Sequence, residues 1–190
     1  SHIKNMNSYI ELFKILKSDY LRYSSHYMGG HFFRLIKVLI HERGFVFTFF
    51  LRMASVKSLL RPFFWLIYHH LCSKYGIQIS SFTKIGSGFY LGHGVGVVIN
   101  KSAEIGSNVT ISQFVTIGSS KGKAATIADN VYIGPSVCLV EDVIIGHDSI
   151  VGAGSVVTKN VPPHCMVAGN PAKIIKKYNL VTKNWDKYSD

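Results

Sequence analysis

IADNVYIGPSVCLVEDVIIGHDSIVGAGSVV, residues 127–157, carries an aliphatic side chain at every sixth position. A period of six fits neither an α-helix, whose period is about 3.6, nor a sheet of long alternating strands. It is typical of a solenoid in which each six-residue unit makes one flat side and one corner, with three sides in a coil of about 18 residues. The stretch therefore predicts a parallel β-helix in which Ile127 stacks on Ile145 and Ile133 stacks on Val151.

The same period extends back to Ile79, but it is interrupted twice. The spacing widens to eight residues between Leu91 and Ile99 and to ten residues between Ile117 and Ile127. A solenoid accepts insertions at its corners, and inserted loops commonly form the binding face. We therefore expect the functional residues near these two breaks.

The composition indicates a folded globular protein with an uneven distribution of charge. Apolar residues make up 47% of the 190 residues, and the net charge is +11. Residues 1–75 hold 11 Lys and Arg against 3 Asp and Glu, whereas residues 76–173 hold 6 against 5. Such a bias favours an anionic partner, for example a membrane surface or a phosphorylated cofactor. Three dispersed cysteines without a C-x-x-C pair, and no evident signal or membrane-spanning stretch, favour a reduced cytoplasmic protein.

The region before Gly76 has apolar residues at helical spacing, and its helices have two open interpretations. In the first, their aromatic faces pack on one another and on the β-helix. In the second, residues 45–74 form a basic amphipathic surface that makes a peripheral contact with a membrane, with Arg52, Lys57 and Arg61 among its cations. The expected helices cover residues 9–16, 32–40, 45–56 and 62–74.

These patterns divide the chain into three parts. They are an α-helical region at 1–75, a mainly β domain at 76–175 formed by the β-helix, and a basic tail at 176–190. Pro162-Pro163 cannot continue a regular ladder of strands, so we expect these residues to end the β-helix.

Several motifs give the chain a family resemblance over about residues 65–177. Ile133-Gly134-Pro135-Ser136, IVGAGSVV at 150–157 and AGNPAK at 168–173 resemble the hexapeptide-repeat acyltransferases. The order of helices, then Leu91-Gly92-His93-Gly94, then the loop at 118–126 is similar to the serine acetyltransferase branch. GIQI at 76–79, with His93-Gly94 and VVINK at 97–101, resembles the colanic-acid type of exopolysaccharide acetyltransferase more closely. The resemblance implies a left-handed parallel β-helix, a homotrimer with active sites at its subunit contacts, and acetyl-CoA as the donor.

Acetyl transfer to an alcohol needs a base, a donor for the oxyanion and a clamp for CoA. His93 is the candidate base, because it stands between glycines at a break in the repeat and a neutral imidazole accepts a proton near pH 7. Gln78 is a candidate hydrogen-bond partner that would fix the tautomer of His93. The resemblance implies that backbone N–H groups of Gly118 and Ser119 bind the oxyanion.

The remaining candidates concern the cofactor and the acceptor. Small residues let the pantetheine arm approach the backbone, and lysines commonly bind phosphates. The cofactor candidates are Gly134, Pro135, Ser136, Ala153, Gly154, Lys173, Lys176 and Lys177. The acceptor candidates are Gly92, Gln113, Lys121 and Lys123.

Departures from the serine acetyltransferase pattern bear on the acceptor. Those enzymes carry an Asp fifteen residues before the catalytic His, an Asp directly before it, and an Arg-His pair at the end of the loop. Here the matching positions hold Gln78, Gly92, and Lys123 with Ala124. An amino-acid acceptor needs charged partners, so we expect the acceptor to be a sugar hydroxyl of a capsule, exopolysaccharide or O-antigen, with L-serine O-acetylation as the alternative.

Two other classes of protein are disfavoured. A zinc-bearing β-helix of the carbonic-anhydrase kind needs three converging histidines, and the repeat region holds only His93, His147 and His164, without an H-x₄-H pair. We therefore expect no metal. We also expect no nucleic acid partner, because the β-helix itself is nearly neutral. The N-terminal helices could join trimers into a larger assembly.

Overall fold

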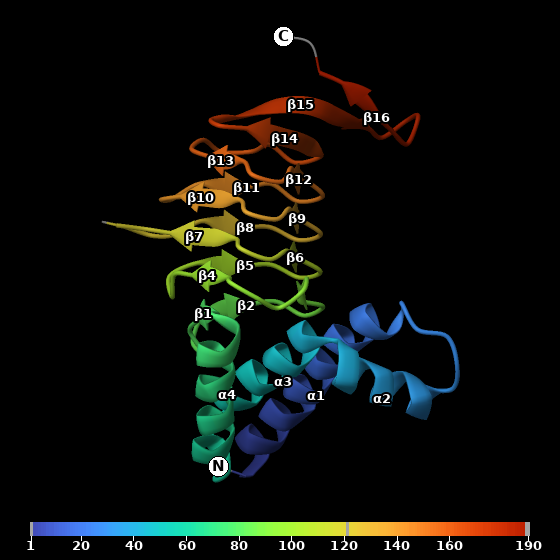
Figure 1. The fold of residues 1–190 in the computed structure, drawn as a ribbon, viewed down its shortest axis with the longest axis vertical. Coiled ribbons are helices and arrows are strands. Elements are labelled where there is room, and N and C mark those ends of the chain that lie inside the picture. Colours follow the sequence, from blue (N-terminus) through green and yellow to red (C-terminus); the bar gives the residue numbers. More distant parts are fainter. Residues whose placement is uncertain (1, 121, 189–190) are drawn as a thin grey trace.

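A solenoid of short strands stands on a layer of helices in the computed structural model, which describes residues 2–120 and 122–188, with side chains from residue 9 onward. Figure 1 shows the helices gathered at one end of the solenoid and the C-terminal strands at the other. The helices are α1 (His2–Ser24), α2 (His31–His41), α3 (Arg43–Ser55) and α4 (Arg61–Tyr75). Pro62 lies in the first turn of α4, where its missing N–H is not needed. Gly76 ends α4 in the left-handed conformation, with φ of 63°.

The solenoid has three sheets in which strands of successive coils pair in parallel, and each coil up to β12 contributes one strand to each sheet. The strands are β1 (Gln78–Ile79), β2 (Lys84–Ile85), β3 (Tyr90–Leu91), β4 (Val98–Ile99), β5 (Glu104–Ile105), β6 (Thr110–Ile111), β7 (Thr116–Gly118), β8 (Thr126–Ile127), β9 (Tyr132–Ile133), β10 (Cys138–Val140), β11 (Ile144–Ile145), β12 (Ile150–Val151), β13 (Val156–Val157), β14 (Cys165–Gly169), β15 (Ala172–Asn179) and β16 (Asn184–Lys187). Sheet A contains β1, β4, β7, β10 and β13; sheet B contains β2, β5, β8 and β11; sheet C contains β3, β6, β9, β12 and β14–β16.

The registers confirm the predicted stacking of aliphatic residues. Ile127 pairs with Ile145, and Ile133 pairs with Val151, both eighteen residues apart. These side chains are almost fully buried. Each buried aliphatic side chain contributes roughly 1.5–3 kcal/mol, so the repeated rungs can offset the entropy of ordering such short strands.

Three columns of turns join the sheets, and each is named here for use below. The His93 corner, between sheets C and A, comprises 92–97, 112–115, 134–137 and 152–155. The loop corner, between sheets A and B, comprises 80–83, 100–103, 119–120 with 122–125, 141–143 and 158–160. The third corner, between sheets B and C, comprises 86–89, 106–109, 128–131, 146–149 and 162–164.

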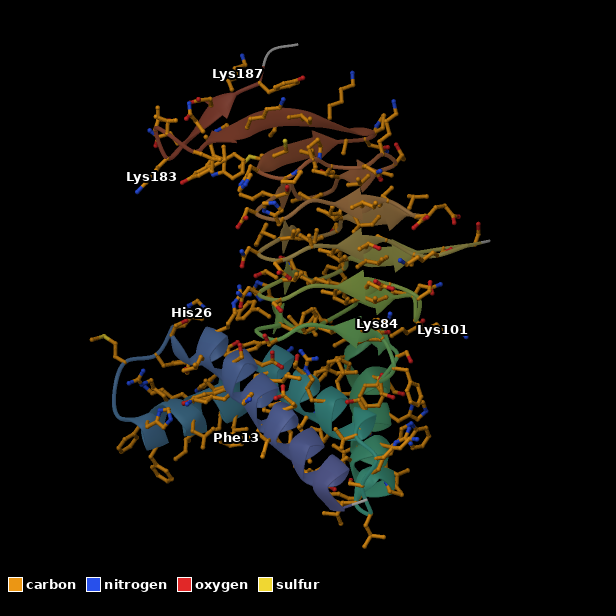
Figure 2. The ribbon with its side chains drawn as sticks, turned by 180° about the vertical axis from the view of Figure 1, so that it is seen from behind. Phe13, His26, Lys84, Lys101, Lys183 and Lys187 are labelled. Atoms are coloured by element: carbon orange, nitrogen blue, oxygen red, sulfur yellow. The ribbon has the colours of Figure 1, made fainter. Side chains whose placement is uncertain are left out.

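The expectation that Pro162-Pro163 would end the β-helix is wrong. The two prolines lie in the third corner, where no ladder N–H is required of them, and the chain then forms β14, which pairs in parallel with β12. The strands β15 and β16 follow as antiparallel partners. Lys183 and Lys187 therefore lie at the end of the molecule opposite the helices (Figure 2).

The structure places the residues of the basic surface expected at 45–74 in two different environments. Phe45, Phe47 and Leu51 of α3 are buried, and Arg52 makes an ion pair with the fully buried Asp19 of α1, with Nε 3.0 Å from Oδ2. Arg52 therefore joins helices. Phe63, Trp65 and Leu66 of α4 are exposed, and the peripheral contact with a membrane stays a prediction. No helix in the described part of the chain is both long and apolar enough to cross a bilayer.

Candidate active site

His93 and Gly94 are the two residues that break the hexapeptide period. The N–H of Gly92 donates to Ile111 O and that of Ser112 to Ile133 O, so Gly92 and Ser112 occupy equivalent positions at the start of their turns. Gly96 and Phe114 occupy equivalent positions with positive φ later in the turns. The two additional residues, His93 and Gly94, are thus inserted between Gly92 and Val95. Their φ values are positive, 61° and 53°, and the His93 side chain is exposed.

The first turn of α3 packs directly against this insertion. A Cβ on Gly94 would lie 2.7 Å from Gly44 N, and a Cβ on Gly44 would collide with the Leu91 carbonyl oxygen. Only glycine permits this approach of two backbones. The contact places Glu42 and Arg43, which directly precede Gly44, beside the His93 corner.

A cavity of about 600 Å³ opens between these helix ends and sheet C. Glu42 and Arg43 give it one carboxylate and one guanidinium. Tyr27 Oη donates a hydrogen bond of 2.9 Å to Glu42 Oε1, which fixes that carboxylate. The lining residues are His41, Glu42, Arg43, Tyr90, Gly92, His93, Val95, Thr110, Ser112 and Tyr132.

Sequence reasoning missed Glu42 and Arg43, because nothing in a helical pattern identifies which helix end meets a distant turn. Gly44, isolated among aromatic residues, was the only available signal of a close approach. Gly92, one of the four acceptor candidates, also lines the cavity, and its role stays a prediction.

The predicted small residues for the cofactor share the His93 corner. Ser136 N donates to Gln113 O, and Gly154 N donates to Pro135 O, so successive turns stack in one column. A Cβ on Gly134 would lie 2.8 Å from Ala153 N, which shows how closely these turns pack. The structure therefore brings together His93, Gln113, Gly134, Pro135, Ser136, Ala153 and Gly154.

The two glutamine candidates differ in their surroundings. Gln113 is half-buried, and its Oε1 has no hydrogen-bond partner among the described residues. Gln78 is exposed on sheet A, does not line the cavity, and makes no hydrogen bond to His93 in the described structure. The role of Gln78 as a tautomer-fixing partner stays a prediction.

The loop candidates lie at a different corner of the same chain. Gly118 ends β7 and Ser119 follows it, and the segment extends away from the solenoid (Figure 1). Ser119 Oγ and Ser120 Oγ donate hydrogen bonds of 3.2 and 2.7 Å to the carboxylate of Glu141. Lys123 Nζ lies 3.5 Å from Glu104 Oε1, and Lys121 lies outside the described residues. Among the described residues of this loop, none lines the cavity beside His93.

The three candidate lysines lie along β15. Lys173 pairs with Ala168 near the hairpin at the His93 corner, whereas Lys176 and Lys177 pair with Met166 and Cys165. Lys177 Nζ lies 4.4 Å from the centre of the Tyr188 ring. Of the three, only Lys173 lies at the end of β15 that is next to the other cofactor candidates.

Comparisons with known proteins agree with this architecture. Residues 124–159 match the family model for the bacterial transferase hexapeptide (six repeats). Serine acetyltransferase 4 of Arabidopsis thaliana is 43% identical over 105 residues, which are 53% of this chain and 30% of that protein. The Bacillus subtilis (strain 168) serine acetyltransferase is 40% identical over 104 residues, with 53% of this chain and 48% of that protein covered. The chain thus spans less than half the length of these curated relatives.

Solved structures extend the likeness to the helices. Neisseria gonorrhoeae serine acetyltransferase in complex with serine matches with a TM-score of 0.76 and 26% identity, covering 90% of this chain and 71% of that one. Serine acetyltransferase in complex with coenzyme A from Brucella abortus strain S19 matches with a TM-score of 0.76 and 27% identity, covering 92% and 71%. The expected fold, a left-handed parallel β-helix preceded by a small helical region, is confirmed.

These relatives also correct the predicted acceptor. They are named as serine acetyltransferases, which overturns the expectation of a polysaccharide acceptor and of a closer relation to the colanic-acid type. Charged residues were sought only at the aligned positions, and the structure adds Glu42 and Arg43, from the helices, to the lining of the cavity. The chain is a hexapeptide-repeat β-helix similar to the serine acetyltransferases over its solenoid and most of its helical region.

Proposed function

We propose that the chain is an acetyl-CoA-dependent O-acetyltransferase whose acceptor is the hydroxyl of L-serine. The observation that carries this proposal is the inserted His93 beside a cavity that also holds Glu42 and Arg43. A zwitterionic acceptor needs one partner for its ammonium and one for its carboxylate, and these two side chains have the required signs. The relatives named above support the same acceptor.

In this mechanism the neutral imidazole of His93 takes the hydroxyl proton as the serine oxygen attacks the thioester carbonyl carbon. The carbonyl electrons move onto its oxygen, and backbone N–H groups at Gly118 and Ser119 stabilise the oxyanion. The tetrahedral intermediate then collapses, the bond from carbon to sulfur breaks, and the imidazolium returns its proton to the leaving CoA thiolate. Acetyl-CoA lies along the His93 corner in this proposal, beside Gly134, Pro135, Ser136, Ala153, Gly154 and Lys173.

The acceptor is tested by thiol release from acetyl-CoA with L-serine, L-serine methyl ester and 3-hydroxypropionate. We expect L-serine to be preferred, because the ester lacks the negative charge and the hydroxy acid lacks the positive one. Turnover of neutral sugars without turnover of serine would overturn the proposed acceptor.

Glu42→Gln and Arg43→Met are expected to raise KM for L-serine about 10- to 100-fold each, because each removes a hydrogen bond to a charged group worth about 1.5–3 kcal/mol. KM for acetyl-CoA should change little in either variant. Steady-state kinetics check this, with Glu11→Gln on the exposed side of α1 as the matched control. An unchanged KM for serine in both variants would contradict the assigned roles.

Assembly as a homotrimer completes the site in this proposal. Outward residues of sheet A carry no charge in the described coils, namely Gln78, Val98, Thr116, Cys138 and Val156, whereas sheet B presents the ion pair of Lys84 and Glu104. A threefold axis along sheet A places the loop corner of one chain beside the His93 corner of the next. The oxyanion donors at Gly118 and Ser119 then come from the neighbouring chain.

Cys138→Glu is expected to dissociate the trimer and abolish transfer, because it places three carboxylates around the proposed axis. Ile144→Glu is the matched control, since Ile144 is an exposed outward residue of sheet B. Light scattering coupled to size exclusion measures the mass of each variant. If the trimer persists in Cys138→Glu but dissociates in Ile144→Glu, the subunit contact lies on sheet B and not on sheet A.

A further inference from the structure

Two histidines and an aspartate converge at the third corner, far along the chain from His93. His147 Nδ1 lies 2.7 Å from Asp148 Oδ2, and His164 Nδ1 lies 4.0 Å from the same oxygen. The two imidazole rings are 4.8 Å apart between centroids and nearly perpendicular. One ligand atom from each of the three residues lies within 4.8 Å of the other two.

The backbone fixes this arrangement. The N–H of His164 donates to His147 O at 3.0 Å, so the two histidines stack in successive coils. Asp148 and His164 have positive φ values of 55° and 57°, so both occupy the left-handed position of their turns. Ser149 Oγ donates a hydrogen bond of 2.9 Å to Pro162 O and fixes the segment that leads to His164. Pro162 and Pro163 further restrict that segment.

We propose that His147, Asp148 and His164 form a Zn²⁺ site that joins the last two turns of the third corner. Zinc binds imidazole nitrogen at about 2.0–2.1 Å and carboxylate oxygen at about 2.0–2.2 Å, so tetrahedral ligands stand about 3.4 Å apart. The observed separations bracket that value, and rotations that move each ligand atom by about 1 Å would close the site. Zn²⁺ would replace the direct contact between His147 Nδ1 and Asp148 Oδ2, with the imidazole proton of His147 carried on Nε2.

The surroundings leave a way in for the ion. Asp148 and His164 line a cavity of about 470 Å³, together with Asn130, Tyr132, Ile150, Tyr178 and Trp185. Three protein ligands leave one position for water, which this cavity can hold. The donor set differs from the three-histidine site considered from the sequence, because one ligand is a carboxylate and all three come from one chain.

The experiment uses the whole protein, stripped with a chelator and titrated with Zn²⁺ against a chromophoric competitor. We expect one Zn²⁺ per chain and a rise in Tm with Zn²⁺, because an ion that binds only the folded state stabilises it. Co²⁺ should bind at the same site and give the visible absorption of a four-coordinate ion. Neither readout requires acetyl-CoA or catalysis, so a failure here leaves the proposed function untouched.

Asp148→Asn and His164→Ala are expected to weaken Zn²⁺ binding at least about 10-fold each. Asn accepts a positive φ readily, so Asp148→Asn keeps the turn intact. The matched control is the double variant His69→Ala with His70→Ala, which removes another pair of histidines, on α4. The proposal is overturned if no Zn²⁺ binds, or if affinity persists in Asp148→Asn and His164→Ala but falls in the control.

Discussion

Replacing His93 with Ala lowers the rate of acetyl transfer at least about 10²-fold while the β-helix stays folded, because a positioned general base contributes about 10²–10⁴-fold. The exposed imidazole belongs to an insertion rather than to the buried rungs, so its removal leaves no cavity in the core. Thiol release under saturating acetyl-CoA and serine measures the loss. Circular dichroism and size exclusion confirm that the variant is assembled.

His93→Asn separates chemistry from backbone geometry. His93 has φ of 61°, and Asn tolerates this region better than Ala does. If the imidazole is the base, His93→Asn is as inactive as His93→Ala. His26→Ala is the control, because His26 is an exposed histidine where α1 meets the solenoid (Figure 2) and lines a neighbouring cavity. Near-normal turnover in an assembled His93→Asn trimer would contradict the role of His93.

The sequence predicted the solenoid well because its signal is local and repeated. Each inward aliphatic residue marks one side of a coil, and the same signal recurs six residues later on the next side. The insertion at His93 was visible for the same reason, since a break stands out against a regular period. The helices were also predicted, because their apolar spacing and Pro62 are local signals.

Contacts between distant segments could not be predicted in this way. Glu42 and His93 line the same cavity because Gly44 and Gly94 let two backbones approach, and no period relates those residues. The convergence of His147 and His164 was not predicted either, because their separation of 17 residues differs from the 18-residue coil of the strict repeat. The sequence also did not show that Ser119 lies at a different corner from His93, because that depends on the number of residues in each turn.

Arg52 is the clearest example of a residue whose role depends on such a contact. Its guanidinium donates to Ile85 O at 2.7 Å and to Gly86 O at 2.6 Å, in addition to its ion pair with Asp19. Asp19 Oδ1 also accepts the N–H of Phe89 at 2.8 Å. This group of hydrogen bonds joins α1 and α3 to the first coil of the solenoid, at the third corner.

Arg52→Met is therefore expected to destabilise the protein by about 3–5 kcal/mol, because it leaves a buried carboxylate and two carbonyls without their cation. For a chain of this size that corresponds to a fall in Tm of about 6–20 °C. Differential scanning calorimetry at fixed protein concentration measures it. Arg34→Met is the control, since Arg34 makes one exposed hydrogen bond, to Gly29 O, and should shift stability by less than about 0.5 kcal/mol.

The pH dependence of Arg52→Met distinguishes a lost ion pair from lost packing. Burial raises the pKa of Asp19 above its usual range, while Arg52 and the Phe89 N–H oppose that rise. Without Arg52 the pKa rises further, so the folded variant binds a proton more tightly than the unfolded chain does. Its stability must then fall as the pH rises from about 3.9, the ordinary value for Asp, through the raised pKa.

The loss of stability relative to the unaltered protein should therefore shrink toward low pH. Adding Asp19→Asn, which keeps an acceptor for Phe89 N–H, should recover part of that loss at neutral pH. A deficit that is independent of pH and unchanged by Asp19→Asn would show that packing, rather than charge, gives Arg52 its importance.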